Sequence, residues 1–215
     1  MMHVQRLAVE FFVRLEKLDE MIAAKVAAGR CRHCDGPLHQ GNYQRKPRGG
    51  MVGAAGEEST RRHSLCCGRR GCRKRTLPPS LRFLGRRVYL EVVVVLASVM
   101  VEVAATARAA QAAIGVPWRT LQRWGSWWLD VFPKLQTWTE LRARFVPPPP
   151  DEAKLPGSLL ARLGGQEDRP EDNSDGGADA RSLLLCARYL APVTSDSVVE
   201  GSRFVTAAFA QMGVA

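Results

Sequence analysis

Four cysteines stand in two close pairs within the most basic stretch of the chain. Two residues separate Cys31 from Cys34, and four separate Cys67 from Cys72. A tetrahedral zinc ion takes four thiolate ligands that converge from two short turns, and this CxxC…CxxxxC pattern can supply them. The pattern therefore predicts one structural zinc ion (Zn²⁺), held by Cys31, Cys34, Cys67 and Cys72.

Other assignments of the ligands and of their chemistry are open at this point. Cys66 competes with Cys67, and we favour Cys67 because Leu65-Cys66 would continue a strand whereas Cys67-Gly68 would open a turn. Redox chemistry would need a CxxC at a helix N-terminus, and catalytic zinc would need an open ligand position beside a base; the sequence shows neither pattern. Three histidines could each replace a cysteine: His33, His39 and His63.

Positive charge is concentrated around the cysteines. Residues 30–90 contain 15 Lys and Arg against 3 Asp and Glu, a net of +12, whereas the whole chain carries +10. Such a surface attracts phosphate backbones by counterion release, although surface charge can also serve solubility alone. We expect five side chains near the second cysteine pair to clamp the backbone of duplex DNA: Arg69, Arg70, Arg73, Lys74 and Arg75.

A second DNA-binding feature is expected over residues 106–128, which read TARAAQAAIGVPWRTLQRWGSWW. They predict an alanine-rich helix, a tight turn at Gly115 and a second helix over residues 118–132. An ordinary helical bundle is the alternative, and Gln111 stands where such motifs usually carry alanine. Three apolar residues would face the core: Val116, Leu121 and Trp124. Four residues between them would face the major groove, where Arg can read guanine and Gln adenine: Trp118, Arg119, Gln122 and Arg123.

The expected fold class is mainly α with a small zinc-ribbon β-module, a helix-turn-helix core and a disordered acidic linker. Residues 1–29 read as an amphipathic helix, because apolar residues recur at spacings of three and four and Gly29 can end it. Residues 30–85 read as the zinc ribbon, with short strands at 38–43 and 62–65 and a flexible loop at 49–59.

Three further segments complete the expected organisation. Residues 86–146 read as the helix-turn-helix domain, within which the tryptophans at 127, 128 and 138 are expected to be core or partner-facing. Residues 147–181 are rich in proline, glycine and acidic residues and predict a disordered linker. Residues 182–215 regain apolar character and predict a C-terminal helical segment, in which Cys186 would be a buried core thiol.

Taken together, CRHC, CCGRRGCRKR and IGVPWRTLQRW resemble the zinc-ribbon plus helix-turn-helix proteins of bacterial insertion sequences. The chain looks like the small helper protein encoded beside a DDE-type transposase or integrase, and its cysteine pairing is similar to the zinc ribbon of phage Ogr/Delta-type transcription activators. The resemblance covers residues 30–130. It implies that the protein recognises element DNA and works with a separate catalytic transposase or integrase subunit.

The expected function is that of a sequence-recognising DNA-binding accessory protein, not an enzyme. Acidic residues cluster in the linker without the strand and helix alternation of a two-metal nuclease. No stretch approaches the ~20 apolar residues of a membrane span, and no signal peptide is apparent, so the expected location is the cytoplasm, at the bacterial nucleoid. A homodimer could form through the N-terminal helix or the C-terminal segment. A transcriptional regulator and an RNA-binding component of a nucleoprotein system are the alternatives.

Overall fold

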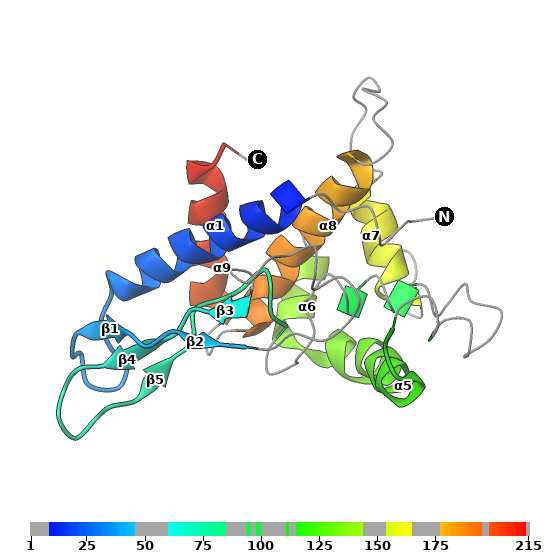
Figure 1. Ribbon diagram of the computed structural model, residues 1–215. Helices are drawn as coiled ribbons and strands as arrows, with labels where there is room; N and C mark the ends of the chain where they lie inside the picture. Colours follow the sequence, from blue (N-terminus) through cyan, green and yellow to red (C-terminus); the bar gives the residue numbers. More distant parts are fainter. Residues whose placement is uncertain are drawn as a thin grey trace. The chain divides into compact units, whose positions relative to one another are not determined.

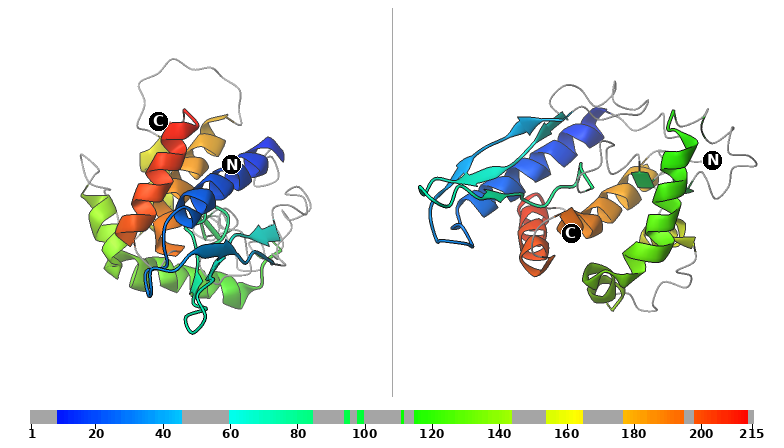
Figure 2. Two further views of the ribbon diagram at one scale, coloured as in Figure 1. Left: turned by 90° about the vertical axis from the view of Figure 1, so that its left-hand side faces the viewer. Right: turned by 90° about the horizontal axis from the view of Figure 1, so that it is seen from below.

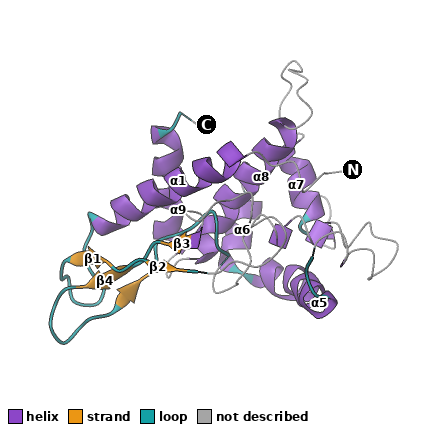
Figure 3. Cartoon of the chain, viewed as in Figure 1, coloured by secondary structure: helices purple, strands orange, loops and turns teal. Residues whose placement is uncertain are grey.

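The computed structural model describes residues 9–45, 60–84, 94–95, 98–99, 111, 115–143, 154–164, 177–194 and 198–213. This part of the chain is mostly helical with a small antiparallel sheet, which agrees with the mainly α class expected from the sequence (Figures 1 and 3). The chain divides into two compact units. We call Ala8–Arg48, Ala54–Leu90 and Ala187–Ala215 the cysteine unit, and we call the unit built on Glu91–Cys186 the α5 unit.

Helix α1 (Val9–Ala27) is the main apolar support of the cysteine unit. Its apolar residues recur every three or four positions, so they line one face of the helix as the sequence predicts. The residues of that face are buried: Phe11, Leu15, Leu18, Ile22 and Val26. Residues 1–8 of the predicted helix lie outside the described residues. The helix ends just before Gly29, whose N–H donates a 3.1 Å hydrogen bond to the Val26 carbonyl.

The C-terminal segment is helical as predicted. Helix α8 (Gly177–Leu190) is followed by the 3₁₀ turn η6 (Ala191–Thr194) and helix α9 (Val198–Gln211), and α9 packs against α1. Phe209 of α9 is fully buried, and the Arg188 guanidinium lies 4.9 Å from the centre of its ring. Cys186 is 1% exposed, as expected of a core thiol.

Two small sets of antiparallel strands lie beside α1 (Figure 2). The first is a three-stranded sheet in the order β1 (Leu38–Gln40), β4 (Leu65–Cys67), β5 (Arg75–Thr76). The second pairs β2 (Tyr43–Gln44) with β3 (Arg61–Arg62). β1 to β4 overlap the two predicted segments, whereas β5 was not predicted. The predicted loop at 49–59 lies outside the described residues.

A buried ionic network fixes the segment after β5 onto α1. Asp19 and Arg82 are each 1% exposed, and the Arg82 Nε donates a 3.0 Å bond to Asp19 Oδ2. The same carboxylate accepts bonds from the Ser80 hydroxyl at 2.6 Å and the Leu81 N–H at 2.7 Å. Because three donors and the positive charge of Arg82 surround the Asp19 carboxylate, its charge is tolerated in the interior.

The α5 unit contains helix α5 (Trp118–Ser126), the π-helical turn η3 (Trp127–Val131), the 3₁₀ turn η4 (Phe132–Lys134) and helix α6 (Gln136–Arg142). Trp128, Phe132 and Trp138 are fully buried, and their rings pack edge-to-face at a centroid distance of 4.9 Å and tilted at 5.1 Å. The buried Trp128 indole donates a 3.0 Å bond to the Ser98 hydroxyl. The predicted second helix therefore runs through a π-turn, and two of the three tryptophans are core residues.

The linker predicted over residues 147–181 is wrong over part of its length. Helix α7 (Gly157–Gly164) lies inside it, and α8 begins at Gly177. The sequence SLLARL places Leu159, Leu160 and Leu163 on one face of α7, and all three are at most 5% exposed. The polar composition of the whole segment concealed this short apolar stripe, which can be buried only against a tertiary partner.

Candidate metal centre and basic surfaces

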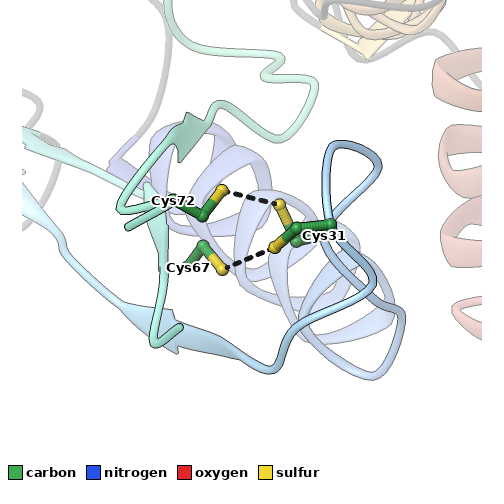
Figure 4. Close-up of side chains that lie close together, drawn as sticks. Cys31, Cys67 and Cys72 are labelled. Carbon is green, nitrogen blue, oxygen red and sulfur yellow. Dashed lines mark hydrogen bonds between the residues drawn. The ribbon is translucent and has the colours of Figure 1, made fainter. Parts of the chain in front are cut away.

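The four predicted cysteines converge on one point. Their sulfur atoms lie within 4.8 Å of one another, with Cys31 to Cys72 at 3.8 Å and Cys34 to Cys67 at 3.4 Å. A tetrahedron of sulfurs at about 2.3 Å from zinc has edges of about 3.8 Å, so the cluster has the dimensions of a four-thiolate site. Figure 4 shows the Cys67 and Cys72 side chains reaching from one turn toward Cys31 on the other.

The first turn is built by backbone hydrogen bonds from Cys31 to Gly36. The carbonyl of Cys31 accepts bonds from the N–H groups of Cys34 at 3.2 Å and Asp35 at 2.7 Å, and the Cys31 N–H donates to the Gly36 carbonyl at 2.9 Å. Asp35 adopts the left-handed conformation with φ at 56°. The Gly36 N–H then points at the Cys34 sulfur. The turn closes tightly enough for both thiols to face the same point.

The second turn repeats this geometry with one change. The carbonyl of Arg69 accepts from the N–H groups of Cys72 at 3.1 Å and Arg73 at 3.4 Å, Arg73 is left-handed with φ at 47°, and the Lys74 N–H points at the Cys72 sulfur. Arg69 thus occupies the place that Cys31 has in the first turn. The missing ligand comes from Cys67, at the end of β4, whose sulfur accepts a 3.4 Å bond from the Arg69 N–H. The second cysteine pair is more widely spaced because Cys67 lies two residues before Arg69, whereas Cys31 itself has that place in the first turn.

The ionisation of these thiols shows why the cluster suits a cation. The Gly36 N–H and the neighbouring sulfurs, working against burial, lower the pKa of Cys34 to about 7. The Arg69 N–H favours the Cys67 thiolate, but burial and the other three cysteines outweigh it and raise the pKa of Cys67 to about 12. The Cys34 thiol therefore ionises readily, whereas ionisation of Cys67 beside it is opposed. A central divalent cation would remove that repulsion and hold all four as thiolates.

The close approach of the two turns requires a residue without a side chain at position 36. A Cβ atom on Gly36 would lie 3.0 Å from the Cys67 sulfur, 3.0 Å from the Arg69 Cβ and 3.3 Å from the Cys34 sulfur. These three atoms belong to both turns, so a larger residue would push the ligands apart. Position 36 was not singled out from the sequence, although a glycine two residues after a CxxC was a usable signal.

The alternative ligands lie away from the cluster. The Cys66 sulfur is 3.4 Å from the Arg73 carbonyl and is not among the clustered atoms, so the structure places Cys67, not Cys66, in the group. His33 and His39 are exposed. His63 is buried beside Glu16 and Glu20 of α1, whose carboxylates already lie 3.6 and 2.8 Å from the Arg61 guanidinium.

The basic residues expected to contact phosphates surround the second turn. The Arg69 guanidinium donates a 2.8 Å bond to the Cys34 carbonyl and so ties the two turns together. The structure describes all five as exposed, so their positive charge faces solvent: Arg69, Arg70, Arg73, Lys74 and Arg75. Residues 60–84 contain no aspartate or glutamate, which leaves this charge uncompensated within the segment.

Helix α5 has the two-sided character expected of it. Val116, Leu121 and Trp124 are at most 5% exposed, whereas Arg119, Gln122 and Arg123 are exposed and Trp118 is half-buried. Gly115 makes the turn before the helix with φ at 68°. The Gln111 carbonyl accepts a 2.9 Å bond from the Gly115 N–H, and its side chain accepts a 3.2 Å bond from the Trp118 N–H. The remainder of the predicted first helix, 106–110 and 112–114, lies outside the described residues.

No protein-family model matches the chain, and neither a curated protein nor a solved structure matches it. Among the described helices, none combines the length and the apolar character that crossing a membrane requires.

Proposed function

We propose that this chain is a DNA-binding accessory protein of a bacterial mobile element, organised around one structural zinc ion. The observation that carries the proposal is the four-sulfur cluster, assembled from two like turns that are ringed by exposed arginines. A closed four-thiolate site leaves no position for substrate, so the ion would be structural rather than catalytic. The antiparallel strands that carry the two turns would then form a zinc ribbon.

Substitutions of two neighbouring cysteines on β4 test the proposed zinc site. Cys67→Ser should lose the metal and lower the melting temperature, because structural zinc supplies much of the folding free energy of such a small module. Cys66→Ser is the matched control, since its sulfur lies outside the cluster. The metal-to-protein ratio of each purified variant gives the answer. One retained zinc and unchanged melting in Cys67→Ser would disprove the ligand assignment, as would a metal-free parent protein.

Two surfaces would divide the work of binding DNA. The arginines at the second turn would hold the phosphate backbone, which positions the protein without reading sequence. Helix α5 would read bases, since Arg119, Gln122 and Arg123 lie on its exposed side and their side chains match the major-groove edges of guanine and adenine. The resemblance to insertion-sequence helper proteins supports a separate transposase or integrase as the partner.

The DNA-binding proposal is tested by selecting the zinc-loaded chain against a random duplex library. One enriched motif is expected. Arg123→Ala should relax that preference, whereas Arg73→Ala should weaken binding to all sequences and flatten the salt dependence by about one unit. Arg142→Ala, an exposed arginine on α6, is the matched charge control. Equal losses on selected and random DNA for Arg123→Ala would show that α5 does not read sequence.

A further inference from the structure

The three-stranded sheet has two unlike faces. In antiparallel strands, residues paired across the ladder share a face. Leu65 pairs with Gln40 and is 2% exposed; both line a pocket of about 280 Å³ against Ala23, Ala24 and Ala27 of α1. This inner face is therefore covered by the helix.

The opposite face carries a row that runs across all three strands. His39 pairs with Cys66, and Cys66 pairs with Arg75, so the three side chains stand side by side on the outer face. His39 and Arg75 are exposed, and Cys66 is half-buried between them. We call His39, Cys66 and Arg75, together with Tyr43, the outer face.

Tyr43 and Arg75 form a fixed pair on this face. The Arg75 guanidinium lies 5.3 Å from the centre of the Tyr43 ring, and its Nη1 is anchored by the Ser64 hydroxyl at 3.1 Å and the Gly41 carbonyl at 3.4 Å. Despite this contact, Tyr43 is 37% exposed, so part of its ring is open to solvent. The pair presents a flat aromatic and cationic surface whose orientation is set in advance.

We propose that the outer face binds an unpaired base of a single-stranded nucleic acid, which stacks on Tyr43 while the flanking phosphates contact the arginines of the second turn. The proposal rests on the proposed function, because it assumes that this basic module meets nucleic acid. The positive charge around the outer face favours a nucleic acid as its ligand. Arg73 and Arg75 border the face, and residues 60–84 contain no acidic group. A duplex would use the charges but not the ring, since its bases are already stacked on one another.

Cys66 provides a reporter at the centre of the outer face. With zinc bound, the four clustered thiols are protected and Cys186 is buried, so Cys66 is the thiol expected to react with a disulfide reagent. A bound base over the face should slow that reaction. The Cys66→Ser variant should lose this reaction, which shows that the signal comes from Cys66. A zinc-sensitive dye recorded in parallel shows that the cluster stays intact. The probes are oligo-dT, oligo-U and a duplex of the same length.

Two substitutions of Tyr43 in the full zinc-loaded chain test whether a base stacks on its ring. Tyr43→Ala should weaken oligonucleotide binding about 5- to 150-fold, the effect of losing one base–aromatic stack, and Tyr43→Phe should retain it. Comparing oligo-dT with oligo-U distinguishes DNA from RNA as the source of the strand. Equal affinity of the two variants, or tight strand binding with no slowing at Cys66, would overturn the proposal. No enriched duplex motif with the parent chain, while oligonucleotides still protect Cys66, would instead count against the proposed duplex recognition alone.

Discussion

Replacing Gly36 by alanine tests whether the close approach of the two turns is needed for the zinc binding proposed for the cluster. The added methyl group would lie 3.0 Å from the Cys67 sulfur and 3.0 Å from the Arg69 Cβ. Non-bonded carbon contacts are favourable at about 3.5–4.0 Å, so both neighbours would have to retreat by a few tenths of an ångström. Crowding of this kind costs about 1–3 kcal/mol. Because the retreating atoms include a ligand, the cost should appear as a loss of about 5- to 150-fold in zinc affinity.

The measurement is competition for zinc against a chromophoric chelator, with cobalt substitution to confirm that four thiolates still bind. Gly41→Ala is the matched control in the same unit, because its methyl group would meet the nearest atom, the Cys66 Cβ, at an ordinary 3.6 Å. The control should change affinity by roughly twofold at most. Identical zinc affinities for Gly36→Ala and Gly41→Ala would refute the claim that position 36 sets the separation of the turns.

Two further predictions concern buried charge in the cysteine unit. Asp19→Ala should lower the free energy of unfolding in urea by about 3 kcal/mol, because it removes the closer of the two carboxylates that face the buried Arg82 guanidinium and leaves only Glu16, at 3.5 Å. A loss below about 1 kcal/mol would show that Glu16 alone compensates the charge of Arg82. Burial lowers the pKa of His63, so between that lowered pKa and about 6.5 the unfolded chain binds more protons than the folded one. The free energy of unfolding should therefore fall as the pH drops below about 6.5. His63→Gln should reduce this dependence on pH, as measured by urea titrations of both proteins at several pH values. An unchanged dependence would mean that His63 has the same pKa in the folded and unfolded chains.

Local pattern was enough to predict the main elements of the cysteine unit. The spacing of apolar residues identified the buried face of α1, because a helix of 3.6 residues per turn permits only one such face. Cys67 was chosen over Cys66 because Cys67-Gly68 would open a turn. The structure does place the Cys67 sulfur in the cluster, although Cys67 itself is the last residue of β4. Gly115 was identified as the turn residue because the turn needs a conformation that glycine adopts without strain, and its φ is positive.

Features that depend on distant partners could not be predicted. Asp19 and Arg82 are 63 positions apart, and each alone reads as an ordinary surface charge. Helix α7 was missed because three leucines in a polar segment gain nothing from helix formation until another element covers them. The likeness between the two cysteine turns was hidden as well, because Arg69 stands in one turn where Cys31 stands in the other and only the backbone shows the correspondence.

The register of β4 joins the metal cluster to the outer face. Adjacent residues of a strand point to opposite sides, so placing Cys67 in the cluster necessarily places Cys66 on the outer face, in line with His39 and Arg75. A slip of β4 by one residue would exchange the two cysteines, which would put Cys67 on the outer face and out of the cluster. Strands of two or three residues specify register weakly by themselves. Ligation of Cys67 would supply that specification, so the proposed zinc would also fix which side chains stand on the outer face.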